Sequence, residues 1–184
     1  MTNRNIDVTG SLGLERGVVR LVPYDSAWPE FFELEAQLLR ETTADKVRRI
    51  EHIGATSIPG MDAKPVLDLM AEVGSEAEAL ALVPAIETLG YEFRPDEDVP
   101  GRMYFPKLSS EGLCTHHLSL TVTGSQFWNR QILFRDYLRS HTEFGRRYIE
   151  LKRALALQFP DDRPSYIEGK TEFVEMVIGL AELE

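Results

Sequence analysis

The chain has 184 residues, of which 43% are hydrophobic and 27% charged, and these values are typical of one soluble globular domain with a single core. Thirty Asp and Glu against twenty Lys and Arg give a formal net charge of −10, so the overall field of the protein repels polyanions. This excludes a general coat for extended nucleic acid, which needs clustered Lys and Arg. A small anionic ligand in a locally basic pocket is compatible with the charge, because net charge does not decide what one site holds.

A single cysteine and the lack of long apolar runs bear on where the protein works. Cys114 alone cannot form an intramolecular disulfide or supply a cysteine-rich zinc cluster, which favours a reducing compartment. Residues 1–10 are polar, and no run approaches the roughly twenty apolar residues that span a bilayer. We therefore expect a cytoplasmic protein with no membrane partner, and the sequence leaves its oligomeric state open.

The first part of the chain predicts a lead-in, a strand and an amphipathic helix. Residues 1–17 show little apolar periodicity, so we expect a flexible N-terminal segment, or an arm that docks elsewhere, ahead of a single domain over 18–184. Residues 18–22 are typical of a short strand. A helix capped by Asp25 or Ser26 follows, marked by apolar residues at helical spacing: Trp28, Phe31, Phe32, Leu38 and Leu39.

The middle of the chain alternates between strands and one helix. Residues 47–53 are β-branched enough for a strand, and residues 65–73 form the mainly apolar run of a strand covered on both faces. Ser75 and Glu78 have the spacing of a capping box, which predicts a helix that Gly90 ends. Three more strands are expected, the last two joined by a hairpin at 109–112: residues 91–94, 102–108 and 113–122.

The last third of the chain is predicted to be helical. Ser125 is expected to cap a helix that runs through Leu138, and apolar stripes mark two more helices over 144–155 and 173–180. The hairpin connection upstream implies a mixed or antiparallel sheet. The order of elements thus predicts an α/β (α+β) fold, a mixed β-sheet with helices packed on it and a helical C-terminal segment.

A polar loop and a charged strand residue form the most informative part of the sequence. The loop after the strand at 47–53 brings together Gly54, Thr56 and Ser57, whose backbone N–H groups and hydroxyls are suited to hold a phosphate, with Lys64 adding positive charge. By itself the loop is equally well explained as a tight structural turn. Asp68 lies in an otherwise apolar strand, where a carboxylate is costly to bury unless it is paired, hydrogen-bonded or bound to a metal. Together these residues favour a binding or catalytic site.

Several motifs in this order resemble the GrpB family of small bacterial proteins, whose fold is similar to that of the nucleotidyltransferase superfamily. The resemblance covers most of the chain: Val22-Pro23-Tyr24-Asp25, His52 through Gly60, Lys64-Pro65, Asp68, Thr115-His116-His117-Leu118, Phe134 through Arg139, Tyr148, Leu151-Lys152, and Lys170 with Phe173. It implies a loop of the Gly-Ser type against nucleotide phosphates and a strand Asp-x-Asp that holds magnesium. Gly54 through Ser57 then correspond to the loop, and Asp68 to the first acid, a metal ligand and catalytic residue.

The magnesium site that the resemblance implies lacks its second acid, because Met70 occupies that position. Positions 68 and 70 of a strand share a face about 6.6 Å apart, whereas 68 and 72 are about 13 Å apart. Magnesium ligands sit at about 2.1 Å, so Glu72 is a poor substitute and is expected to be a solvated strand end. Magnesium is thus a cofactor expected from the resemblance alone.

Strand alternation predicts that the two adjacent histidines point to opposite faces of the sheet. His117 shares a face with Thr115 and Ser119, and His116 shares the other with Cys114 and the leucines that follow. We expect His117 to face the pocket as a catalytic residue and His116 to be a hydrogen-bonded core or helix-facing histidine. The family often carries a second histidine where this chain has Ser119, a departure that weakens a His-x-His metal site.

The basic residues divide into one favoured ligand and several surface positions. Arg102 and Lys107 are an odd number apart, so a regular strand points them to opposite faces. Arg102 is favoured as a bidentate phosphate clamp, and Lys107 is expected to be solvated. Lys152 and most arginines of the helical part are predicted to form a charged outer face. The resemblance makes Arg135 and Lys170 exceptions, and Lys170 is a predicted substrate ligand.

Three functions of different classes fit these residues. The first is an enzyme that binds a nucleotide or another phosphorylated small molecule and transfers a nucleotidyl or phosphoryl group with magnesium. The second is a phosphate-ligand-binding module whose metal site has decayed, linked to coenzyme A metabolism because some relatives are fused to a dephospho-coenzyme A kinase. The third is a hydrolase that uses Asp68 and His117.

Overall fold

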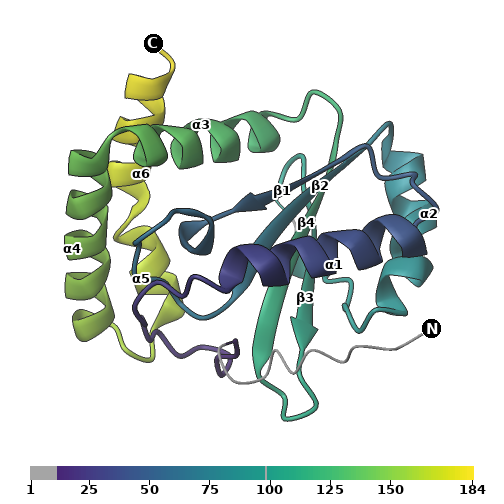
Figure 1. The fold of residues 1–184 in the computed structure, drawn as a ribbon, viewed down its shortest axis with the longest axis horizontal. Coiled ribbons are helices and arrows are strands. Elements are labelled where there is room, and N and C mark those ends of the chain that lie inside the picture. The colour runs from purple at the N-terminus through teal and green to yellow at the C-terminus, as the bar shows by residue number, and fades with distance from the viewer. Residues whose placement is uncertain (1–11, 98) are drawn as a thin grey trace.

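The computed structural model describes residues 12–97 and 99–184 and has a four-stranded sheet at its centre (Figure 1). The strands are β1 (Arg49–Ile53), β2 (Leu67–Val73), β3 (Met103–Leu108) and β4 (Cys114–Val122). Their order across the sheet is β1-β2-β4-β3, with β2 and β4 parallel and each edge strand antiparallel to its neighbour. The predicted mixed sheet is confirmed.

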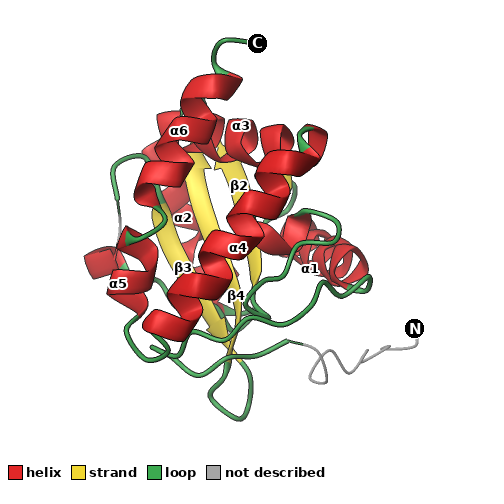
Figure 2. Ribbon diagram, turned by 90° about the vertical axis from the view of Figure 1, so that its left-hand side faces the viewer, coloured by secondary structure: helices red, strands yellow, loops and turns green. Residues whose placement is uncertain are grey.

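Helices cover both faces of the sheet. On one face lie α1 (Trp28–Thr42) and α2 (Glu76–Glu87), and the C-terminal part supplies the other face with α3 (Gln126–Ser140), α4 (Thr142–Gln158), α5 (Arg163–Glu168) and α6 (Thr171–Ala181). Figure 2 shows α4 and α6 in front of the sheet. The predicted helical C-terminal segment is confirmed, with α5 as an additional short helix. None of the helices in the described part of the chain has the length and apolar character needed to cross a membrane.

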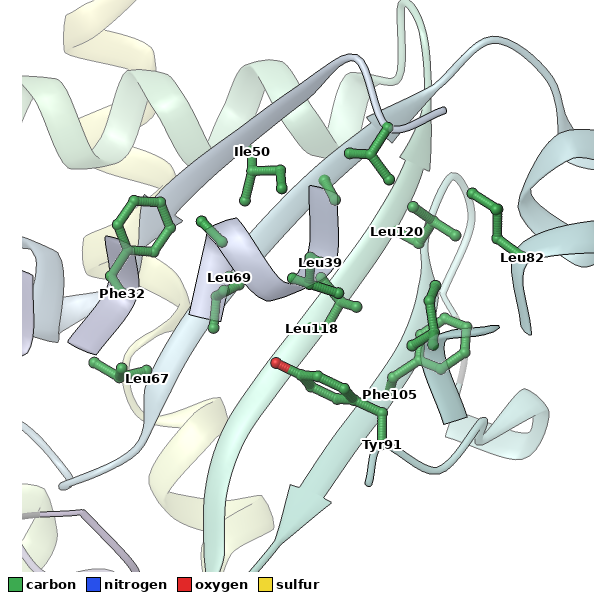
Figure 3. Close-up of a cluster of buried hydrophobic side chains, with 14 of the residues drawn as sticks. Phe32, Leu39, Ile50, Leu67, Leu69, Leu82, Tyr91, Phe105, Leu118 and Leu120 are labelled. Atoms are coloured by element: carbon green, nitrogen blue, oxygen red, sulfur yellow. The ribbon is translucent and has the colours of Figure 1, made fainter. Parts of the chain in front are cut away.

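The two faces of β2 have different chemistry because successive side chains point in opposite directions. Leu67, Leu69 and Ala71 are buried against α1 and α2, where they join β4 and β3 residues such as Leu118 and Phe105 in the main hydrophobic cluster (Figure 3). Burial of one such leucine contributes about 1.5 to 3 kcal/mol. The opposite face of β2 carries Asp68, Met70 and Glu72, so the apolar core fixes which way the polar residues of this strand point.

The predicted N-terminal strand is wrong, and part of the lead-in is ordered on the sheet. Within residues 18–22 only Val22 forms a bridge, to Ala63. Leu12 and Leu14 are buried, and the backbone of Leu14 exchanges two hydrogen bonds with Cys114. Residues 12–14 therefore behave as the docking arm that was the alternative. Of the flexible segment predicted over 1–17, residues 1–11 lie outside the described residues.

Two further local predictions differ from the structure. Residues 91–94 run beside β3 through two backbone hydrogen bonds, from Glu92 to Pro106 and from Arg94 to Tyr104, but they do not form a regular strand. Ser125 precedes α3 without capping it, because its hydroxyl donates to the Gly101 carbonyl at 3.0 Å. By contrast the Ser75 cap is confirmed, since its hydroxyl accepts from the Glu78 N–H at 3.2 Å.

Two charged residues expected in solvent are instead held in ion pairs. Glu72 is buried and receives a bidentate pair of hydrogen bonds from Arg49, at 2.8 and 3.0 Å. Lys107 donates to Glu35 on α1 at 2.8 Å, and the carboxylate of Glu35 is buried. Strand alternation correctly separates Lys107 from Arg102, but the sequence does not reveal the acid that faces Lys107 on α1.

A close approach between Gly54 and Asp68 fixes the geometry where β1 ends. Gly54 has φ +67° and ψ −173°, a backbone conformation open almost only to glycine. A Cβ at this position would lie 2.4 Å from Oδ2 of Asp68 and 3.0 Å from its Cβ. Glycine is therefore required here for two independent reasons, its backbone angles and the room that Asp68 occupies.

We expect Gly54→Ala to lower the free energy of unfolding by about 3 kcal/mol or more, because it adds a steric clash to backbone strain. Gly60→Ala is the matched control, since Gly60 also has a positive φ, +76°, but a Cβ there meets nothing within 4 Å. The control should cost only about 1 to 2 kcal/mol. Urea unfolding of both variants checks the difference, and equal costs would contradict the packing of Asp68 against Gly54.

Candidate functional site

A cleft of about 560 Å³ lies between the polar face of the sheet and the C-terminal helices. Its size is within the range of small-molecule sites. Asp68 and Ser119 reach it from the sheet, Tyr148 from α4 and Tyr166 from α5. The elements that meet here are far apart in the chain, so the cleft exists only once the helical part has packed on the sheet.

Asp68 and His117 meet in this cleft because β2 and β4 are parallel and in register. The two residues are direct partners in the strand pairing, and His117 Nδ1 lies 2.9 Å from Asp68 Oδ1. The His117 side chain is 13% exposed, and that of Asp68 is 37% exposed toward the cleft. The two side chains, whose meeting the sequence alone could not establish, therefore lie in one cleft.

The pair is electrostatically matched. Burial alone would raise the pKa of Asp68, but the hydrogen bond from His117 and the positive charges of His117 and Lys64 outweigh it and hold this pKa below its usual value. Burial likewise opposes the charge on His117, but its hydrogen bonds to Asp68 and Cys114 leave its pKa raised. One oxygen of the Asp68 carboxylate is thus held by a histidine.

The hydroxyls of the Gly54 loop are engaged within the protein. Thr56 lines the cleft, but its Oγ1 lies 2.9 Å from His52 Nε2, and burial lowers the pKa of this histidine to about 4. Ser57 donates to the Gly54 carbonyl at 2.6 Å and lines a different cavity, on the α1 side of the loop. The structure therefore brings Gly54 and Thr56 to the cleft, leaves Ser57 out of it, and gives both hydroxyls structural partners.

The described lining of the cleft is strongly basic although the protein as a whole is acidic. Two acidic residues, Asp68 and Glu97, stand among six basic ones: Lys64, Arg102, Arg130, Lys152, Arg163 and Lys170. The predicted ligands Lys64, Arg102 and Lys170 are thus brought to the same cleft as Asp68 and His117. The guanidinium of Arg102 lies over the rings of Tyr104 and Phe127, 4.7 and 5.5 Å from their centres.

Three lysines of the cleft have lowered pKa values, chiefly because they are withdrawn from water and next because of neighbouring cations. Burial, and then the charge of Lys170, lowers the pKa of Lys152 to about 7. Burial, and then the charge of Lys64, lowers the pKa of Lys170 to about 8. The pKa of Lys64 is lowered by burial and by Arg163. Nearby carboxylates therefore do not fully compensate the positive charge of these ammonium groups.

Lys152 and Arg163 are cleft residues that the sequence reasoning missed. Lys152 was expected on a solvated outer face, but it is 2% exposed and its ammonium donates to the Asp62 carbonyl. It lies one helical turn from Tyr148, on the buried side of α4, so the apolar stripe that includes Tyr148 held the signal. Arg163 begins a short helix that the sequence analysis did not predict.

Arg135 was expected to be an exception to the charged outer face of the helices. It is such an exception, but it does not line this cleft. It is buried and donates to Glu51 at 2.7 Å and to the His52 carbonyl at 3.0 Å. Burial opposes its charge, but the hydrogen bonds to Asp136 and Glu51 leave its pKa raised. Arg135 therefore ties α3 to β1 rather than binding a cleft ligand.

The residues around Asp68 do not fit a magnesium site. Met70, at the position of the second acid, is fully buried between Ile53 and Trp128. Glu72 is occupied by Arg49, and Asp68 by His117. Over residues 12–97 and 99–184, no three His, Cys, Asp or Glu side chains are grouped as metal ligands. A hard cation such as magnesium needs several oxygen ligands, and among the described residues of β2 only Asp68 offers a carboxylate oxygen to the cleft.

An irregularity at the start of β4 changes the expected face of Cys114. Lys107 pairs with His116, and its neighbour Leu108 pairs with Cys114, so Thr115 is an extra residue in β4. Such a bulge re-aims the side chain beyond it. Cys114 therefore joins His117 instead of His116, with Sγ 3.3 Å from His117 Nε2. His116 is buried toward α1 and α2, as predicted, and burial lowers its pKa to about 4.

Comparison with known proteins identifies relatives over nearly the whole chain. The family model described as GrpB protein matches residues 18–179. The UPF0157 protein PA4798 of Pseudomonas aeruginosa is 37% identical over 166 residues, which are 89% of this chain and 67% of that protein. The crystal structure of the conserved protein GrpB from Enterococcus faecalis is similar with a TM-score of 0.80 and 32% identity, covering 88% of this chain and 96% of that one.

Two weaker matches concern parts of the chain. A dephospho-CoA kinase of Mycolicibacterium paratuberculosis is 35% identical over 81 residues, which are 42% of this chain and 20% of that protein. The Cid1 poly(U) polymerase is similar with a TM-score of 0.48 and 15% identity, a level that carries no argument about function. The family model and the relatives that match along most of the chain agree, and the chain belongs to the GrpB family.

Proposed function

We propose that the cleft binds a phosphorylated small molecule without the help of a metal ion. The observation that carries the proposal is the cluster of Lys64, Lys152 and Lys170, crowded together in a largely buried cleft. None of the three ammonium groups forms an ion pair with a carboxylate among the described residues, and Lys152 reaches only a backbone carbonyl. Two carboxylates lie near them, and both have other partners: Asp68 is hydrogen-bonded to His117, and Asp62 is paired with Arg153.

The charge balance of the cleft favours an anionic occupant. Cations placed together away from water raise the free energy of the folded state unless a partner offsets them. A phosphate group supplies several strong acceptors and more than one negative charge, so it offsets this cost without a metal. The aromatic rings of Tyr104, Tyr148 and Tyr166 offer apolar surface for the rest of such a molecule.

The competing proposal is transfer of a nucleotidyl or phosphoryl group with magnesium at Asp68. It requires Asp68, one oxygen of which is bonded to His117, to bind the ion with no second acid at position 70. The donor set described above therefore supports binding without magnesium over this alternative. Because a segment of the chain is similar to part of a dephospho-coenzyme A kinase, coenzyme A precursors belong among the ligands to be tested.

We expect ATP, dephospho-coenzyme A or glucose 6-phosphate to raise the Tm of the protein in the presence of EDTA. A ligand at a hundred times its Kd stabilises by about 2.7 kcal/mol, which is roughly 5 to 10 °C for a domain of this size. The shift should be lost in Lys64→Met and Lys170→Met. It should persist in Lys46→Met, which removes an exposed lysine outside the cleft.

A thermal-shift screen with and without magnesium decides between the two proposals. A shift that EDTA abolishes and Asp68→Ala removes would support the magnesium site instead. If none of these ligands produces a shift under either condition, phosphate binding by the cleft is wrong.

We also expect the affinity for ATP to fall between pH 7.5 and 9. ATP gains no charge over this range, whereas Lys152 and Lys170, with pKa values of about 7 and 8, are then increasingly neutral in the free protein. A lysine must take up a proton before it pairs with phosphate, at a cost of about 1.4 kcal/mol for each pH unit above its pKa. The protonated form binds, so affinity decreases as pH rises.

Calorimetric titrations at several pH values check this prediction. The affinity for ATP should depend less steeply on pH in Lys152→Met, because this variant lacks one of the two lysines that lose their charge over this range. An affinity independent of pH in the unmodified protein would show that these lysines do not meet the ligand.

A further inference from the structure

Cys114, His117 and Asp68 form a continuous hydrogen-bonded line beside the cleft. His117 Nδ1 lies 2.9 Å from Asp68 Oδ1, and its Nε2 lies 3.3 Å from Cys114 Sγ. The two nitrogens of one imidazole thus contact an acid on one side and a thiol on the other. This is the arrangement of a nucleophile, its base and the group that orients the base.

The backbone holds this line in place. The bulge at Thr115 turns Cys114 to the face of His117, and parallel pairing sets His117 opposite Asp68. Leu14 pairs with Cys114 through two backbone hydrogen bonds, so the residue is fixed from both sides of the strand. Cys114 nevertheless remains partly exposed, as a reacting thiol must be.

A second, small cavity of about 90 Å³ lies beside the thiol. Cys114 lines this cavity, and His117, Lys64 and Arg163 line both it and the larger cleft. Lys64 is partly buried, and its ammonium group forms no hydrogen bond or ion pair with another described residue. Arg163 is hydrogen-bonded to Tyr104, but its Nε is buried without a hydrogen-bond partner in the described chain. Glu15, Glu92 and Glu97 also line the small cavity, so the position that favours an anion is where Lys64 and Arg163 border both spaces. This observation does not depend on the contacts within the triad.

We propose that Cys114 is the nucleophile of a thiol-dependent cleavage of acyl phosphates. The phosphate would lie among Lys64 and Arg163, and the acyl group would occupy the small cavity beside Cys114. The position of the phosphate rests on the proposed function of the cleft, whereas the reactivity of the thiol rests on the triad alone.

The reaction proceeds in two balanced steps. The thiol proton passes to His117 Nε2, the thiolate attacks the acyl carbon, and the bond from that carbon to the phosphate oxygen breaks. The phosphate leaves with the proton from His117, and Cys114 carries a thioester. His117 then takes a proton from water, hydroxide attacks the thioester, and the proton returns to the thiolate as the carboxylic acid departs. Neither step needs a metal or a redox partner.

The sequence makes the test direct, because Cys114 is the sole thiol of the chain. At pH 6.5, iodoacetamide should alkylate the native protein at least about tenfold faster than the same thiol in urea, because His117 accepts its proton. His117→Gln should remove this advantage. His141→Gln, at the end of α3 and outside the cleft, is the control and should keep it.

Acetyl phosphate tests the substrate class. Incubation should add one acetyl group to the protein that hydroxylamine removes as a thioester, with inorganic phosphate released, and Cys114→Ala should abolish both. A native thiol that reacts no faster than the unfolded one, or an activated thiol that acetyl phosphate does not acylate, would overturn the proposal. If phosphate ligands produce thermal shifts but Cys114 is not acylated, the acyl-transfer proposal is wrong and phosphate binding by the cleft stands. If Cys114 is acylated but no phosphate ligand produces a shift, phosphate binding by the cleft is contradicted.

Discussion

The parallel pairing of β2 with β4 is the constraint on which the candidate site depends. It sets Asp68 directly opposite His117 on the face of the sheet that the main hydrophobic core does not use. Gly54 then leaves the room that the Asp68 carboxylate needs, and the C-terminal helices close the space above it. A shift of this pairing by one residue would send Asp68 into the leucines under α1 and α2, so the site and the core are specified by the same register.

The cleft and the protein as a whole carry charge of opposite sign. The chain carries a formal net charge of −10, yet basic side chains dominate the described lining of the cleft. Close, partly buried groups govern what a site holds, because their interaction is only weakly screened, whereas distant surface acids are screened by salt. The acidic exterior therefore disfavours long polyanions, whereas the occupant that we propose for the cleft is a small anion.

Much of the fold could be predicted from the sequence, because periodicity and caps are local. The Ser75 cap, the apolar run that becomes β2 and the helical C-terminal part are examples. The site depended on contacts that local patterns do not carry. The bulge at Thr115 reversed Cys114, and Ser57 turned its hydroxyl to its own loop. Lys152 was the exception, since the stripe on α4 already placed it inward.

Metal-independent binding is tested most directly by a crystal structure of the protein grown with ADP and magnesium. The predicted result has phosphate oxygens within hydrogen-bonding distance of Lys64 and Lys170, with Asp68 still bonded to His117. A magnesium ion that bridges Asp68 and the phosphates, with His117 displaced from the carboxylate, would contradict it.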